Sequence, residues 1–326
     1  MSTSPHVTAW TLSDLQNHLG MAIDLEFWTI PFYRVAYHAL DSSVSANTAA
    51  RTAINEVSQQ EMFHCQCAWN IAQAFGTSYD FTTRDAFKYE GKTIPHLQFD
   101  LESPNPTTSA VTINGTSYNF SNYSAELDAS TFAERINAMC LVEYPDWKAT
   151  TYQQLKPKAS EYASIGHFYT AIKTLMNETT PQAFKDGSLV SASVTGGGTS
   201  QTGLFSSHMP SSFSEKVTES TTGGMAQINQ LINAIVEEGE GTSSAPSSVP
   251  AEYQFDGQTD PHFEAFLAVY TDGLTQKPMK SGGAAAIMAA LPAFLTAVQA
   301  NFEAGGTSPG FMGAMFTFDG VISSQF

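Results

Sequence analysis

The sequence has few basic residues. It contains 14 Lys and Arg against 31 Asp and Glu in 326 residues, a formal net charge of -17. Nucleic acids and anionic lipid surfaces bind proteins largely through positive charge, so we expect neither a nucleic acid nor a membrane as a partner. Cations are the natural counterpart of such a chain, although an acidic surface also serves simple solubility.

Cysteine is also scarce. The three cysteines, Cys65, Cys67 and Cys140, are an odd number, and the first two are only two residues apart in a segment with helical spacing. A disulfide framework is therefore not expected, which fits a reducing compartment. The N-terminus lacks the basic and apolar regions of a signal peptide, and no run approaches 18 uninterrupted apolar residues. We expect no membrane span and a cytoplasmic location.

Hydrophobic residues make up 42% of the chain, enough for a substantial core. Apolar residues recur at three- and four-residue spacings in four long segments, which predicts four long helices. Further helical patterns are shorter or lie nearer the C-terminus. The sequence thus predicts a mainly α protein built on a four-helix bundle, with long helices over residues 11–40, 47–74, 160–175 and 225–238 and further helices over 131–142, 260–266 and 284–302.

We expect one domain over residues 1–326, with three additions to the bundle. Residues 77–130 are rich in Pro, Thr, Ser and Asn, and alternating runs on both sides of Asn114-Gly115 predict a β-hairpin in a β-rich insertion. Residues 186–222 are rich in Gly, Ser and Thr, but their triple glycine lacks the Lys and the spacing of a phosphate loop. Residues 275–326 form a C-terminal extension.

The chemistry is concentrated in the second predicted helix. Glu61-x-x-His64 places a carboxylate and an imidazole on one helical face, close enough to share a metal ion. Glu26 falls on the apolar stripe of the first helix, where a carboxylate must be hydrogen-bonded, protonated or metal-bound. An isolated pattern of this kind is weak, and a core histidine satisfied by a neighbour is the alternative for His64. Together the three residues favour a metal site.

A two-metal centre in a bundle needs a carboxylate on the first and third helices, and Glu-x-x-His on the second and fourth. The first two helices comply. The third offers His167, with Glu161 nearly two turns away. The fourth offers three acidic residues near its end but no histidine three positions later; they are Glu237, Glu238 and Glu240.

Several of these stretches resemble a known family, the bacterial ferritin-like proteins that include the iminophenyl-pyruvate dimer synthase domain of violacein- and rebeccamycin-type pathways. The resemblance covers residues 10–270 in patches and is carried by Leu25-Glu26-Phe27-Trp28-Thr29-Ile30-Pro31-Phe32-Tyr33, Gln60-Glu61-Met62-Phe63-His64, Ile165-Gly166-His167-Phe168-Tyr169, Ile235-Val236-Glu237-Glu238-Gly239-Glu240-Gly241 and His262-Phe263-x-x-Phe266. It implies a ferritin-like four-helix bundle.

The resemblance also implies a set of ligands. Glu26, Glu61 and His64 would bind metal in the first half, and Glu240 and His262 in the second half, with His262 supplied from beyond a loop. The family motif usually has Glu after Ile-Gly on the third helix, where this chain has His167. An imidazole binds one metal through one nitrogen and does not bridge two ions as a carboxylate does.

Three functions follow as hypotheses. The first is a metal-dependent oxidoreductase in which two irons, or manganese or zinc in their place, act with dioxygen or peroxide on a small organic substrate. The second is a metal-binding or storage-like bundle without turnover. The third is a structural bundle in which the polar residues form buried ion pairs. Homo-oligomers are compatible with all three. Aromatic residues near the motifs either wall a substrate cavity or form ordinary core; they are Trp28, Phe32, Tyr33, Phe63, Trp69, Phe168 and Tyr169.

Overall fold

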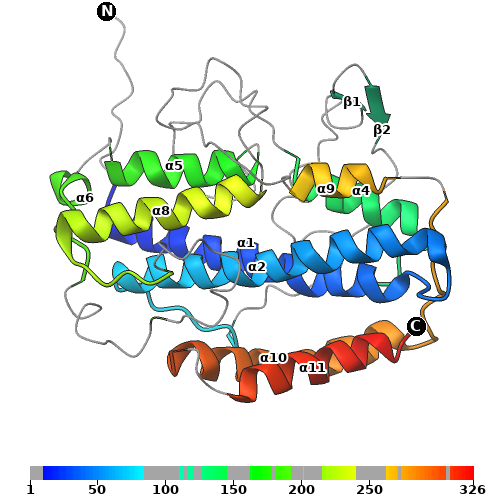
Figure 1. Cartoon of the computed structure of the whole chain (residues 1–326). Coiled ribbons are helices and arrows are strands. Elements are labelled where there is room, and N and C mark those ends of the chain that lie inside the picture. The colour runs from blue at the N-terminus through cyan, green and yellow to red at the C-terminus, as the bar shows by residue number, and fades with distance from the viewer. Residues whose placement is uncertain are drawn as a thin grey trace, which may run out of the picture.

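The structure is a computed structural model. It describes residues 10–83, 110–113, 116–119, 127–144, 162, 164–177, 181–191, 201, 215–239, 262–270, 273–305 and 309–326. All statements below concern these residues. They form a mainly helical molecule in three layers (Figure 1).

The central layer consists of two long helices, α1 (Leu12–Ala39) and α2 (Thr48–Ala74), which lie side by side along most of their length (Figure 1). Helix α1 begins at a capping box, in which the side chains of Thr11 and Asp14 each accept a hydrogen bond from the other's backbone N–H. Helix α2 is followed by Gly76, whose φ of 66° is the left-handed conformation that favours glycine after a helix. Both helices confirm the sequence prediction.

A second layer covers one face of this pair with half-length helices. In Figure 1, α5 (Ile165–Asn177) and α8 (Thr221–Gly239) lie together over one half of α1 and α2, and α4 (Phe132–Val142) and α9 (His262–Ala268) lie over the other half. The third and fourth long helices expected from the sequence therefore span only part of the bundle. Two further short helices, α4 and α9, cover the remaining half. A single turn, α6 (Gln182–Lys185), follows α5.

The third layer is a helical hairpin on the opposite face, formed by α10 (Gly283–Glu303) and α11 (Pro309–Ser323) (Figure 1). Helix α10 was expected, whereas no helix was predicted for the segment of α11. Arg34 of α1 anchors the hairpin through an ion pair with Asp319 (Nε to Oδ1, 2.7 Å). By length and mean hydropathy alone α10 would be able to cross a membrane, a criterion that core helices of soluble proteins also meet.

The only strands in the described residues are β1 (Ala110–Ile113) and β2 (Thr116–Asn119). They pair antiparallel, with Ala110 opposite Asn119 and Ile113 opposite Thr116, as the Asn-Gly signal predicts. Of the β-rich insertion expected over residues 77–130, the structure supports only this hairpin, and residues 84–109 and 120–126 lie outside the described residues. Within the described part of that region this hairpin is the only β-structure. An Asn-Gly turn between alternating runs is a specific signal for a hairpin, whereas a general richness in polar and turn-forming residues is a weak signal for further strands.

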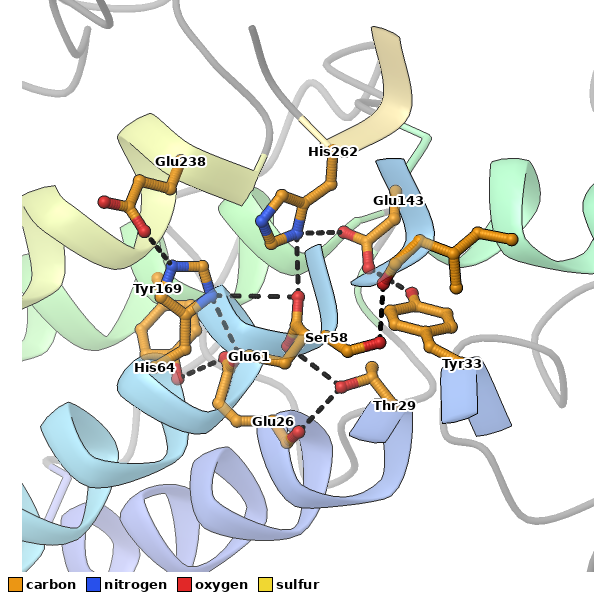
Figure 2. A network of polar contacts seen from close by, with 11 residues as sticks. Glu26, Thr29, Tyr33, Ser58, Glu61, His64, Glu143, Tyr169, Glu238 and His262 are labelled. Atoms are coloured by element: carbon orange, nitrogen blue, oxygen red, sulfur yellow. Dashed lines mark hydrogen bonds and ion pairs between the residues drawn. The ribbon is translucent and has the colours of Figure 1, made fainter. Parts of the chain in front are cut away.

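The apolar core forms two clusters that meet at the middle of α1 and α2. The larger cluster includes Phe63 of α2 and Ile235 of α8, and the smaller one includes Val57 of α2 and Phe263 of α9. The polar residues described next lie between these clusters, where the second layer changes from α5 and α8 to α4 and α9 (Figures 1 and 2).

Candidate metal centre

Three polar side chains of α1 and α2 point toward the second layer, which is formed by α4, α5, α8 and α9 (Figure 2). Glu26 comes from the middle of α1, and Glu61 and His64 from successive turns of α2. All three side chains are about 1% exposed. His64 Nδ1 lies 3.6 Å from Glu26 Oε2 and 3.8 Å from Glu61 Oε1, so one imidazole nitrogen faces both carboxylates.

The second layer contributes two further polar side chains, which lie at the ends of its helices. Glu143 is the C-cap of α4, and His262 is the first residue of α9. His262 Nδ1 lies 2.7 Å from Glu61 Oε1 and 3.6 Å from Glu143 Oε2. The shorter contact is poorly aligned for a hydrogen bond, so Nδ1 of His262 and Oε2 of Glu143 have no hydrogen-bond partner among the described residues. Glu61 thus lies between the two histidines (Figure 2).

Hydrogen bonds fix the three carboxylates. The hydroxyl of Tyr169 donates to Glu26 Oε1 at 2.6 Å, and that of Tyr33 donates to Glu143 Oε1. Thr29 Oγ1 lies 2.9 Å from Glu61 Oε2 and also within reach of the Glu26 backbone carbonyl. Each carboxylate therefore has one oxygen held by a hydroxyl of the protein, while its other oxygen faces an imidazole nitrogen (Figure 2).

Burial, neighbouring charges and hydrogen bonds shift the pKa values of these groups. Burial, reinforced by the charge of Glu143, raises the pKa of Glu61 to about 7. Burial lowers the pKa of His262, but the neighbouring carboxylates Glu61 and Glu143 outweigh it and raise that pKa to about 9. Burial likewise opposes the charged form of His64, yet its pKa is raised because Glu238 and Glu26 accept hydrogen bonds from its ring. Without a metal, the cluster therefore holds protons near neutral pH.

Four of the six predicted ligands meet at this place. Within the described residues, the group close enough to share one ion is Glu61, His64 and His262, whose ligand atoms lie within 4.8 Å of one another, and Glu26 adjoins it. His167 is not in that group. It is fully buried on α5, where its ring makes an edge contact with Tyr162 (ring centroids 5.3 Å apart). Glu240 lies outside the described residues.

Two acidic residues at this site, Glu143 and Glu238, were not among the ligands predicted from the sequence. Glu143 follows directly after the predicted helix over residues 131–142, and Glu238 was one of three acidic residues near the end of the fourth helix. Both continue an apolar stripe, since Glu143 follows Met139 by four residues and Glu238 follows Ile235 by three. The signal that singled out Glu26, a carboxylate in register with core positions, applies to both.

The neighbouring aromatic side chains belong to the core. All seven aromatics that were weighed as cavity walls are at most 3% exposed, and they are Trp28, Phe32, Tyr33, Phe63, Trp69, Phe168 and Tyr169. A cavity of about 330 Å³ at the start of α2 and another of about 560 Å³ near the start of α1 are lined by none of the cluster residues. The aromatics therefore belong to the packed core, and neither of these two cavities extends to the cluster.

Comparison with known proteins identifies the family. The family model described as ferritin-like matches residues 19–271, which is more than half of the chain. The chain belongs to the ferritin-like family. Of the solved structures, a ferritin-like protein from Caulobacter vibrioides is 31% identical, with 97% of this chain and 96% of that chain covered and a TM-score of 0.71. No curated protein matches this chain. These comparisons do not extend to the narrower iminophenyl-pyruvate dimer synthase group.

The family match contains every residue of the cluster, from Glu26 to His262, whereas the hairpin of α10 and α11 lies beyond it. In this ferritin-like protein the buried group of Glu61, His64 and His262 is a candidate metal-binding site.

Proposed function

We propose that this ferritin-like protein binds two metal ions, most naturally iron, in the buried cluster and acts as an oxidoreductase on a small organic substrate. Glu26 and His64 would serve one ion and Glu143 and His262 the other, with Glu61 shared between them. The observation that carries the proposal is the position of Glu61, whose Oε1 faces the Nδ1 atoms of both histidines, at 3.8 and 2.7 Å.

The donor set fits iron or a similar ion. Carboxylate oxygens and imidazole nitrogens suit iron, manganese and zinc, and the cluster contains no thiolate, which argues against a closed structural zinc site. The charges fit as well. Glu26, Glu61, Glu143 and the nearby Glu238 carry four negative charges when ionised, and two divalent ions would neutralise them. Burying such a set of carboxylates without cations would cost several kcal/mol, so protons or metal must compensate it.

The residues of this chain would hold and shield the ions. Tyr169 and Tyr33 fix the outer carboxylates through their hydroxyls, which leaves one oxygen of each free to face the centre. The apolar clusters on both sides exclude water, and exclusion of water strengthens the interactions between ligands and ions. When bound, a pair of iron or manganese ions supplies the redox equivalents for chemistry with dioxygen or peroxide.

The choice of substrate class rests on the narrower resemblance noted in the sequence, since enzymes of that group oxidise small organic molecules.

The contacts between the ligands also support a second candidate, a structural cluster of ion pairs. The contacts of His262 with Glu61 (2.7 Å) and of His64 with Glu238 (3.1 Å) satisfy charges without any metal. In that case the side chains would stabilise the fold and bind no ion.

Metal analysis separates these functions. The protein is purified without a nickel column and loaded with ferrous iron, and bound iron and oxygen consumption are measured. We expect about two equivalents of iron per chain, with consumption of oxygen. Bound iron without oxygen consumption would leave a metal-binding protein without turnover, and no bound iron after aerobic loading would leave only the structural cluster.

A further inference from the structure

The two histidines of the cluster have different surroundings. Both turn Nδ1 toward the carboxylates, and their rings stack with centroids 5.2 Å apart. The Nε2 atom of His64 lies 3.1 Å from Glu238 Oε2 and forms a hydrogen bond with it. The Nε2 atom of His262 has no hydrogen-bond partner among the described residues. Figure 2 shows Glu238 behind His64 only.

The carboxylates do not show this difference. Glu26 receives a hydrogen bond from Tyr169, and Glu143 receives one from Tyr33. Each of the two proposed positions therefore has one outer carboxylate held by a tyrosine, and both share Glu61. The contact that distinguishes them is the one between His64 and Glu238.

A carboxylate behind a ligating imidazole has a known physical effect. It fixes the ring orientation and the tautomer, keeps the proton on the far nitrogen and makes the near nitrogen a stronger ligand. Removing such a partner usually lowers metal affinity by about 10- to 100-fold.

Glu238 lies in the last turn of α8, where the helix dipole disfavours a negative charge. Its side chain is 12% exposed, and it reaches His64 across the contact between α8 and α2. Its negative charge therefore does not favour its own helix, and at this position it contacts His64.

We propose that Glu238 is a positioning residue that makes the two metal positions unequal, so that the position of Glu26, Glu61 and His64 takes up the first ion and that of Glu61, Glu143 and His262 the second. This inference rests on the proposed two-metal function. Glu238 acts through His64 and does not itself bind the ion.

An anaerobic titration of the full-length protein with Co²⁺ tests the inference, because Co²⁺ reports each binding step by calorimetry and by its visible absorption. We expect the natural protein to bind two ions in two separate steps. Glu238→Ala should weaken the tighter step about 10- to 100-fold and change its absorption band, while the weaker step keeps its affinity. Glu238→Gln retains an oxygen that accepts a hydrogen bond from the Nε2–H of His64 and should recover part of the loss.

Glu237→Gln is the matched control, since it removes the same charge from the neighbouring residue, and we expect it to leave both steps unchanged. Two equal steps in the natural protein would overturn the inference, as would an unchanged tighter step in Glu238→Ala. If Glu238→Ala does not fold, as judged by circular dichroism, an unchanged tighter step in Glu238→Gln together with an unchanged absorption band overturns it equally. Absence of any Co²⁺ binding by the natural protein would refute the proposed function itself.

Discussion

Glu61 offers the sharpest test of the metal centre because both proposed positions use it. Glu61→Gln preserves the shape of the side chain and removes its charge. With Co²⁺ at 100 times its dissociation constant, one occupied site stabilises the folded state by about 2.7 kcal/mol. For a chain of this size that corresponds to a rise in Tm of roughly 4 °C. Glu61→Gln should abolish this rise, since an amide cannot serve as an anionic ligand shared by two ions.

The same substitution should have little effect on the metal-free protein at pH 6. The pKa of Glu61 is about 7, so its carboxyl group is mainly protonated at that pH and resembles an amide. We expect the free energy of unfolding to change by less than about 1 kcal/mol. If the cluster were a structural ion pair with His262, removal of one partner would instead cost about 3–5 kcal/mol.

Thermal unfolding followed by circular dichroism, with and without Co²⁺, measures both effects. Glu56→Gln is the control, because Glu56 lies on the same helix but is exposed to solvent. A role of Glu61 as a shared metal ligand is refuted if Glu61→Gln strongly destabilises the metal-free protein, or if the variant responds to Co²⁺ like the natural protein.

Three further predictions concern titration and packing. The pKa values of Glu61 (about 7) and His262 (about 9) are raised, so the folded protein binds more protons than the unfolded chain between pH 6 and pH 9. The metal-free protein should therefore lose about 4 kcal/mol of stability over this interval, and a Tm that rises with pH would contradict this expectation. Tyr169→Phe leaves Glu26 Oε1 without its donor and should lower the free energy of unfolding by about 1–3 kcal/mol in urea titrations at pH 7; an unchanged midpoint would show that this hydrogen bond contributes nothing. Although partial burial opposes ionisation, His38 and Arg34 lower the pKa of Asp319 to about 2. Asp319→Ala should therefore lower the free energy of unfolding by about 1 kcal/mol at pH 7 and by less at pH 3, where the carboxylates of unfolded chains are largely protonated. An equal loss at both pH values would exclude this ion pair as the cause.

The sequence determined the frame of the protein. Helical periodicity and local capping signals depend on neighbouring residues only, so α1, α2, α8 and α10 were predicted close to their observed bounds. The β-hairpin was also found, because the Asn114-Gly115 signal is local. Glu61 and His64 could be paired from spacing alone, since both lie on one face of one helix.

Tertiary structure decided the second half of the site. Glu143 and His262 stand at the ends of α4 and α9, and no local pattern shows that these ends meet above Glu61. On one long third helix the candidate ligand was His167, whereas the observed layer is made of half-length helices, and the ends of α4 and α9 carry Glu143 and His262. Spacing along a chain fixes which side chains share a helical face, but only packing fixes which helix ends converge, because that depends on contacts between residues far apart in the sequence.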